Sequence, residues 1–111
     1  MELPSERSIL RFLISEDDRH GGKPLYEWIV VKALENGLAG ATVLRGMMGF
    51  GASGMLHSFK IQRRAQDTPV VVEIVDLRIH LKSFLESIGE TIGEGMFILK
   101  DSDIRHYRAG K

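Results

Sequence analysis

The sequence predicts an α+β domain with the ferredoxin-like split βαβ arrangement, in which two helices cover one face of an antiparallel sheet. Apolar runs with strand character alternate with two segments of helical periodicity, in the order β-α-β-β-(β)-α-β. The chain has 111 residues, which is the size of one domain. We therefore expect residues 1–111 to form a single unit.

The first half of the chain supplies two strands and the helix between them. Ile9 to Ile14 are apolar except for Arg11, as expected of a central strand. Pro24 suits the first turn of a helix, and Asn36-Gly37 suits the end of that helix. Residues 41–48 form the next predicted strand.

The second half of the chain repeats the pattern. Residues 56–63 alternate in polarity and predict a third strand. The β-branched run 70–75 is a fourth strand or an extension of the third. A second helix follows, with apolar residues at helical spacing, and residues 96–99 form the last strand.

The charge balance argues against a nucleic-acid-binding protein and removes one obstacle to self-association. Lys plus Arg and Asp plus Glu number 15 each, so the net charge is zero, without the basic surplus of a DNA-binding protein. Little repulsion opposes self-association. The predicted strands are apolar on both faces, so we expect the sheet face without helices to pack against other subunits.

The N-terminal residues, the lack of a long apolar run and the lack of cysteine predict a cytoplasmic protein. The polar, acidic start does not resemble a signal peptide. No apolar run approaches the roughly 20 residues that span a bilayer, so we expect no membrane insertion. There is no cysteine, and therefore no disulfide, thiolate metal site or cysteine nucleophile.

No residues with catalytic spacing stand out. The chain has no Gly-x-Ser-x-Gly elbow, and its four histidines lack metal-ligand spacing. We therefore expect neither an enzyme nor a metal site within one subunit. Convergence of histidines across a subunit interface stays open.

Two glycine-rich segments are the strongest candidates for a binding site. Gly46–Gly54 has four glycines in nine positions, and Gly93-Glu94-Gly95 precedes the last strand. Such segments are turns, mobile loops or anion cradles built from main-chain N–H groups. In a split βαβ sheet the two strands concerned are not neighbours, so the segments can meet only across a subunit interface.

Several segments resemble the family known as domain of unknown function 190, in the same order over about residues 7 to 107. They are Gly21–Tyr26, Gly37–Ser53, Asp67–Asp76 and Gly93–Gly95. That family is similar to the PII signalling proteins, so the resemblance implies a PII-like, ferredoxin-like trimer.

The resemblance also implies a nucleotide site between subunits. PII proteins have a Lys-Gly-Phe-Gly sequence and a Gly-Asp-Gly turn, which line that site, and Met48-Gly49-Phe50-Gly51 and Gly93-Glu94-Gly95 are similar. Met48 replaces the lysine and removes a phosphate-binding charge. Arg105 and Arg108 fall where PII proteins have C-terminal phosphate-contacting arginines.

From these patterns we predict a non-enzymatic PII-like regulator that binds a small anionic effector, with an adenine nucleotide as the candidate ligand. Binding would order residues 46–58, and a partner such as a membrane transporter or channel would recognise the ordered segment. The alternatives are a divalent-metal-binding trimer that resembles the ion-tolerance proteins and uses His57, and a ligand-free interaction scaffold. The predicted ligand-binding residues are Gly46, Gly49, Phe50, Gly51, Gly93, Glu94, Gly95 and Arg105.

Overall fold

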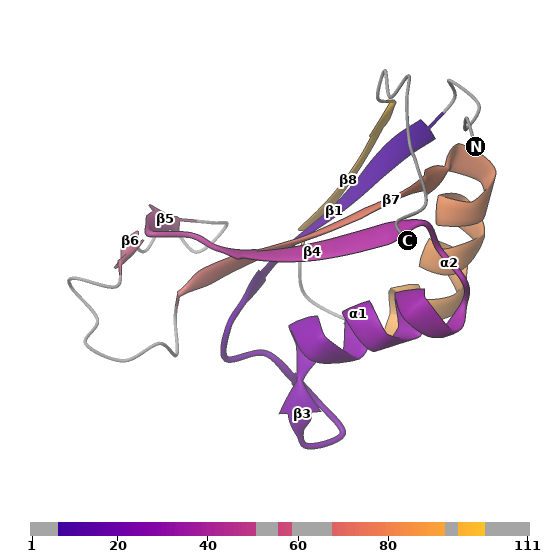
Figure 1. Cartoon of the computed structure of the whole chain (residues 1–111). Helices are drawn as coiled ribbons and strands as arrows, with labels where there is room; N and C mark the ends of the chain where they lie inside the picture. Colours follow the sequence, from indigo (N-terminus) through magenta and orange to yellow (C-terminus); the bar gives the residue numbers. More distant parts are fainter. Residues whose placement is uncertain (1–6, 51–55, 59–67, 93–95, 102–111) are drawn as a thin grey trace, which may run out of the picture.

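A four-stranded antiparallel sheet with two helices on one side forms the protein, as a computed structural model describes it for residues 7–50, 56–58, 68–92 and 96–101 (Figure 1). The strand order is β4-β7-β1-β8, and every neighbouring pair is antiparallel. This is the predicted ferredoxin-like arrangement. The sheet strands are β1 (Arg7–Ser15), β4 (Gly40–Arg45), β7 (Pro69–Leu77) and β8 (Met96–Asp101), and the helices are α1 (Leu25–Glu35) and α2 (Arg78–Ile92).

The core lies between the sheet and the two helices. Alternate residues of the two central strands point toward the helices and are fully buried, namely Leu10, Phe12, Val72 and Ile74. The helices add their own apolar stripes, Leu25, Ile29 and Ala33 from α1 and Leu81, Phe84 and Ile88 from α2. Burying a large apolar side chain contributes about 1.5–3 kcal/mol, so this layer is the main source of stability.

The other side of the sheet, called the open face here, carries no helix of the described residues (Figure 1). The remaining positions of β1 and β7 lie on it, and apolar side chains such as Ile9, Leu13, Val71 and Val75 are half-buried there. Arg11 Nε donates to Glu73 Oε2 at 2.6 Å in the middle of this face. The expected apolar character on both faces is therefore present, with one ion pair at the centre of the open face.

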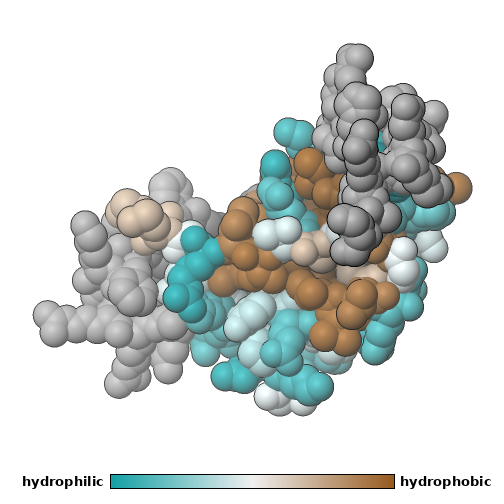
Figure 2. Space-filling model, in the orientation of Figure 1, coloured by the Kyte–Doolittle hydropathy of each residue, from teal (hydrophilic) through white to brown (hydrophobic). Residues whose placement is uncertain are grey.

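Edge strand β4 is exposed along most of its length. Figure 2 shows apolar side chains gathered in a band over β4 and the neighbouring part of α1. Val43, Leu44, Val31 and Leu34 are the large exposed apolar residues of these two elements. An apolar edge strand with unpaired backbone groups is a surface that proteins usually cover.

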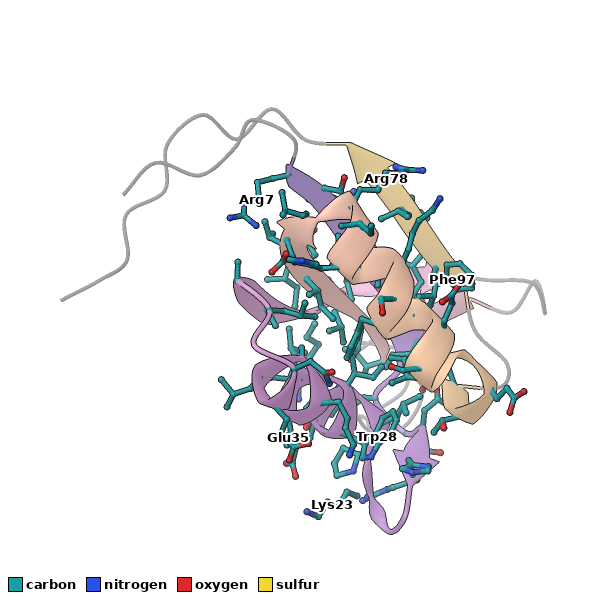
Figure 3. The ribbon with its side chains drawn as sticks, turned by 90° about the vertical axis from the view of Figure 1, so that its right-hand side faces the viewer. Arg7, Lys23, Trp28, Glu35, Arg78 and Phe97 are labelled. Atoms are coloured by element: carbon teal, nitrogen blue, oxygen red, sulfur yellow. The ribbon has the colours of Figure 1, made fainter. Side chains whose placement is uncertain are left out.

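A small hairpin precedes α1. It pairs β2 (Arg19–His20) with β3 (Lys23–Pro24), and the turn uses positive φ angles of 60° and 81° at Gly21 and Gly22, which glycine adopts without strain. The His20 ring lies 4.5 Å from the Trp28 ring, so the hairpin covers this half-buried aromatic residue. Figure 3 shows Trp28 beside the hairpin that carries Lys23.

The predicted second and third strands differ from the observed ones. The strand predicted at 41–48 ends at Arg45, and a separate strand, β5 (Met48–Phe50), follows. The strand predicted at 56–63 appears as β6 (Leu56–Ser58), which pairs with β5 and not with the main sheet, while residues 59–67 lie outside the described part. Alternating polarity identified a strand correctly, but it does not specify the partner strand.

Candidate functional site

The strand ends that flank the two glycine-rich segments, Arg45 of β4 and Met96 of β8, lie at the same end of the sheet but at opposite edges. Arg45, the last residue of β4, pairs with Val70, and Val70 pairs with Ile14 on the next strand. Leu13 in turn pairs with Met96, the first residue of β8. At about 4.8 Å between neighbouring strands, roughly 14 Å separates the two edges. Within one subunit, Arg45 and Met96 therefore lie at separate edges, and the intersubunit site stays a prediction.

The long connection between β4 and β7, residues 46–68, is anchored to the sheet at its base. The Gly46 N–H donates to the Pro69 carbonyl at 2.7 Å. A Cβ at position 46 would lie 2.9 Å from Pro69 Cγ, so only glycine fits without a shift of the proline ring. Gly46 therefore serves close packing, and its own N–H is already engaged.

Charged and polar side chains gather at the same base. Arg45 donates to Glu16 Oε2 at 2.6 Å, and Glu16 in turn donates its backbone N–H to the Thr68 carbonyl at 2.9 Å. Within the described residues, Glu16 Oε1 and Thr68 Oγ1 are buried without a hydrogen-bond partner. The Arg45 side chain is 57% exposed and presents a cation where the long connection begins.

The first part of the long connection is a two-stranded hairpin that projects from the sheet (Figure 1). Gly49 pairs with His57, and Phe50 pairs with Leu56. Met47 and Met48 are exposed by 79% and 57%. Flexible apolar side chains of this kind suit a surface that meets another molecule.

Three of the eight predicted ligand-binding residues fall in the described part of the chain. Gly46, Gly49 and Phe50 lie together at the base and in the first strand of the hairpin. Gly51, Gly93, Glu94, Gly95 and Arg105 lie outside the described residues, so their role stays a prediction. Among the described residues no three metal-binding side chains come together.

Sequence analysis missed Arg45, Glu16 and Thr68. Glu16 and Arg45 are 29 positions apart, and only the sheet register brings them together. The signal available was the charge of Arg45 directly before Gly46. Arg45 offers a cation three residues before Met48, and Met48 is the position at which the resemblance to PII proteins would place a lysine.

Comparison with known sequences gives a family match. The family DUF190, described as Uncharacterized ACR, COG1993, matches residues 7–104. A UPF0166 protein of Aquifex aeolicus is 36% identical over 99 residues, covering 89% of this chain and 93% of that protein. The UPF0166 protein MJ1524 of Methanocaldococcus jannaschii is 31% identical over 97 residues, covering 86% and 89%.

Comparison with solved structures gives the same fold at low sequence identity. CPII, a nitrogen regulatory PII-like protein from Thiomonas intermedia K12 solved with ADP, AMP and bicarbonate, has a TM-score of 0.68 and 13% identity, covering 90% of this chain and 89% of CPII. The divalent ion tolerance protein CutA1 of Ehrlichia chaffeensis has a TM-score of 0.62 and 12% identity, covering 92% and 86%. No helix in the described ranges is long and apolar enough to cross a membrane. The chain belongs to the DUF190 family and has the ferredoxin-like fold of the PII-like proteins.

Proposed function

We propose that this protein is a non-enzymatic, cytoplasmic regulator that forms a homotrimer. It binds a small anionic effector in the clefts between the subunits, and an adenine nucleotide is the candidate effector. The long connection would carry the signal to a partner protein, for which a membrane transporter or channel is the candidate. CPII, which shares the fold, was solved with ADP and AMP, and this supports the choice of ligand.

The observation that carries the proposal is the position of the two glycine-rich segments. The residues that flank them lie at the same end of the sheet, Arg45 at the β4 edge and Met96 at the β8 edge. When the β4 edge of one subunit lies beside the β8 edge of the next, Gly49 and Phe50 approach the neighbour's copy of residues 93–95. Main-chain N–H groups and Arg45 then suit a phosphate-bearing ligand.

Two surfaces support the homotrimer. The open face is apolar around the Arg11–Glu73 pair, and β4 leaves its edge exposed, with Leu44 half in solvent. A sheet with one uncovered apolar face and an uncovered edge is stabilised when other copies cover both. Sedimentation at three times the 12.5 kDa chain mass is the expected result, and a monomer at all concentrations would remove the intersubunit site.

Calorimetric titration tests the ligand. ATP, ADP, AMP and cyclic AMP are each added to the untagged protein, with inorganic tripolyphosphate as the control that lacks the adenosine group. Saturable heat with at least one adenine nucleotide, and weaker binding of tripolyphosphate, is the expected result. Absence of heat with all four nucleotides would remove the nucleotide claim.

Metal analysis of the same protein preparation distinguishes the proposed nucleotide-binding regulator from the alternative, a divalent-metal-binding trimer. CutA1 shares the fold, and its name refers to divalent ions. Metal analysis of protein purified without a histidine tag should give substoichiometric copper and zinc. One metal per chain, together with no nucleotide heat, would favour the metal-binding trimer.

A further inference from the structure

A cleft of about 250 Å³ lies between the end of α1 and the side of α2, on the helix-covered side of the sheet. Residues 36–38 form one wall, and His80, Ser83, Phe84 and Ser87 form the other. Nearby Asp76 lies seven strand positions from Pro69, which is about 23 Å along β7. The cleft is therefore at the opposite end of the sheet from the glycine-rich segments.

Asp76 fixes the imidazole of His80 at this cleft. Asp76 is 4% exposed, and its carboxylate accepts the backbone N–H groups of Ala39 and Leu77 at 2.8 and 2.6 Å. Arg7 Nη1 lies 3.4 Å away and balances its charge. His80 Nδ1 lies 2.6 Å from Asp76 Oδ1. An ionised carboxylate only accepts, so Nδ1 carries a proton, and in the tautomer with that single ring proton Nε2 is an acceptor.

Two further cleft residues also donate a hydrogen bond to a backbone carbonyl of the protein itself. Asn36 Nδ2 donates to the Lys32 carbonyl at 2.7 Å, and Ser87 Oγ donates to the Phe84 carbonyl at 2.6 Å. A carbonyl oxygen can only accept, so neither assignment is ambiguous. Among the described residues, Asn36 Oδ1 and the Ser87 Oγ lone pairs accept no hydrogen bond, and with the Ser83 lone pairs they outnumber the remaining donors, the Ser83 hydroxyl and the second Asn36 N–H.

The helix ends add to this polarity. Asn36 and Gly37 follow the last turn of α1, whose carbonyl end carries a partial negative charge. The positive end of α2 already faces Asp76, which lies two residues before the first residue of the helix and accepts from the Leu77 N–H. Leu38 and Phe84 supply apolar wall between the polar groups.

We propose that this cleft is a second ligand site and binds a small organic cation, a primary ammonium joined to a compact apolar group. The ammonium donates to His80 Nε2, Asn36 Oδ1 and Ser87 Oγ, and the apolar group lies against Leu38 and Phe84. The site needs neither the trimer nor a nucleotide, so it stands independently of the proposed function.

Nuclear magnetic resonance of the full chain tests the proposal with three probes of equal size, namely benzylammonium, benzyl alcohol and benzoate. Benzylammonium should shift the His80 ring protons and the Ser83 and Ser87 amides in a saturable way. Benzyl alcohol should bind about tenfold more weakly, because it has one donor and no charge, and benzoate should cause no saturable shift. Benzoate binding as tight as benzylammonium binding, or no saturation by benzylammonium up to about 20 mM, would overturn the proposal.

Two variants and a control make the test specific. Asn36→Asp adds a negative charge to the wall and should tighten benzylammonium binding about fivefold. His80→Leu removes the ring acceptor and should weaken it about tenfold, while Asp76 keeps its other donors. His20→Gln, on the distant hairpin, should leave the affinity unchanged.

If His80→Leu does not fold, Asn36→Asp decides, and an unchanged or weaker affinity in that variant would refute the cation site. Saturable binding of Zn²⁺ alone at His80, without benzylammonium binding, would replace the organic cation with a metal.

Discussion

The two faces of the sheet are built from the same strands but have different roles. On the helix-covered face Leu10, Phe12, Val72 and Ile74 are fully buried within one subunit. On the open face, their immediate sequence neighbours stay half-buried around an ion pair. Because side chains alternate along a strand, one run of sequence specifies both faces. The buried positions therefore stabilise the fold of one subunit, and the half-buried positions are the ones that the proposed subunit association would cover.

The largest expected effect on stability is the difference between an alanine substitution at Phe12 and one at its neighbour Leu13. Phe12→Ala leaves a cavity in the core and should lower the free energy of unfolding by about 3–5 kcal/mol. Leu13→Ala removes a half-buried side chain and should lower the unfolding free energy of the dissociated subunit by about 1 kcal/mol. Urea unfolding of both variants at a concentration that keeps the chain dissociated measures the difference. Equal losses would mean that the two faces are not distinct in this way.

The fold was largely predictable from periodicity. The stripe of Leu81, Phe84 and Ile88 identified α2, and all three residues are buried. Gly37 was predicted to end α1 and has a φ of 71°. The partner of residues 56–58 was not predictable, because alternation at Leu56 and Ser58 fits a hairpin with β5 as well as a strand of the main sheet.

The second prediction breaks the ion pair of the open face. Glu73→Gln leaves Arg11 without its charged partner, and when another copy covers the face, Arg11 becomes a buried unpaired charge. We expect subunit association to weaken by about 2–4 kcal/mol, and the unfolding free energy of the dissociated subunit to fall by less than about 1 kcal/mol. Sedimentation over a concentration series measures the first value.

A double variant serves as the control for that prediction. Arg11→Met combined with Glu73→Leu replaces the pair by apolar side chains of similar volume and should restore association. Dissociation of the double variant as complete as that of Glu73→Gln would show that the open face is not the interface.

The third prediction compares the two glycines at the ends of β4. A Cβ at Gly46 would lie 2.9 Å from Pro69 Cγ, whereas one at Gly40 would meet nothing within 4 Å. We expect Gly46→Ala to lower the unfolding free energy by about 1–3 kcal/mol and Gly40→Ala to change it by less than about 1 kcal/mol. Urea unfolding of the two variants gives both numbers. If Gly46→Ala leaves the unfolding free energy unchanged, close packing does not explain Gly46, and a role in ligand binding would be the better explanation.

The candidate site was less predictable than the fold because long-range register assembles it. Glycine content located the segment around Gly49, but nothing in the sequence paired Arg45 with Glu16 or placed Thr68 beside them. Asp76 and His80 are four residues apart across a strand–helix junction, and this spacing was a usable signal that went unused.

The smallest expected effect on stability concerns Arg45. Its pair with Glu16 is short at 2.6 Å, but the arginine side chain is 57% exposed, so Arg45→Met should lower the unfolding free energy by less than about 1 kcal/mol. If Arg45 supplies the cation that Met48 lacks, the same variant should bind adenine nucleotide about tenfold more weakly. Urea unfolding and calorimetric titration of one preparation measure both.

Glu16→Gln is the matched control for Arg45→Met. It removes the competing carboxylate charge and frees the guanidinium, so this variant should bind the nucleotide at least as well as the unchanged protein. Loss of affinity in Glu16→Gln together with retention in Arg45→Met would move the phosphate contact away from the base of the long connection.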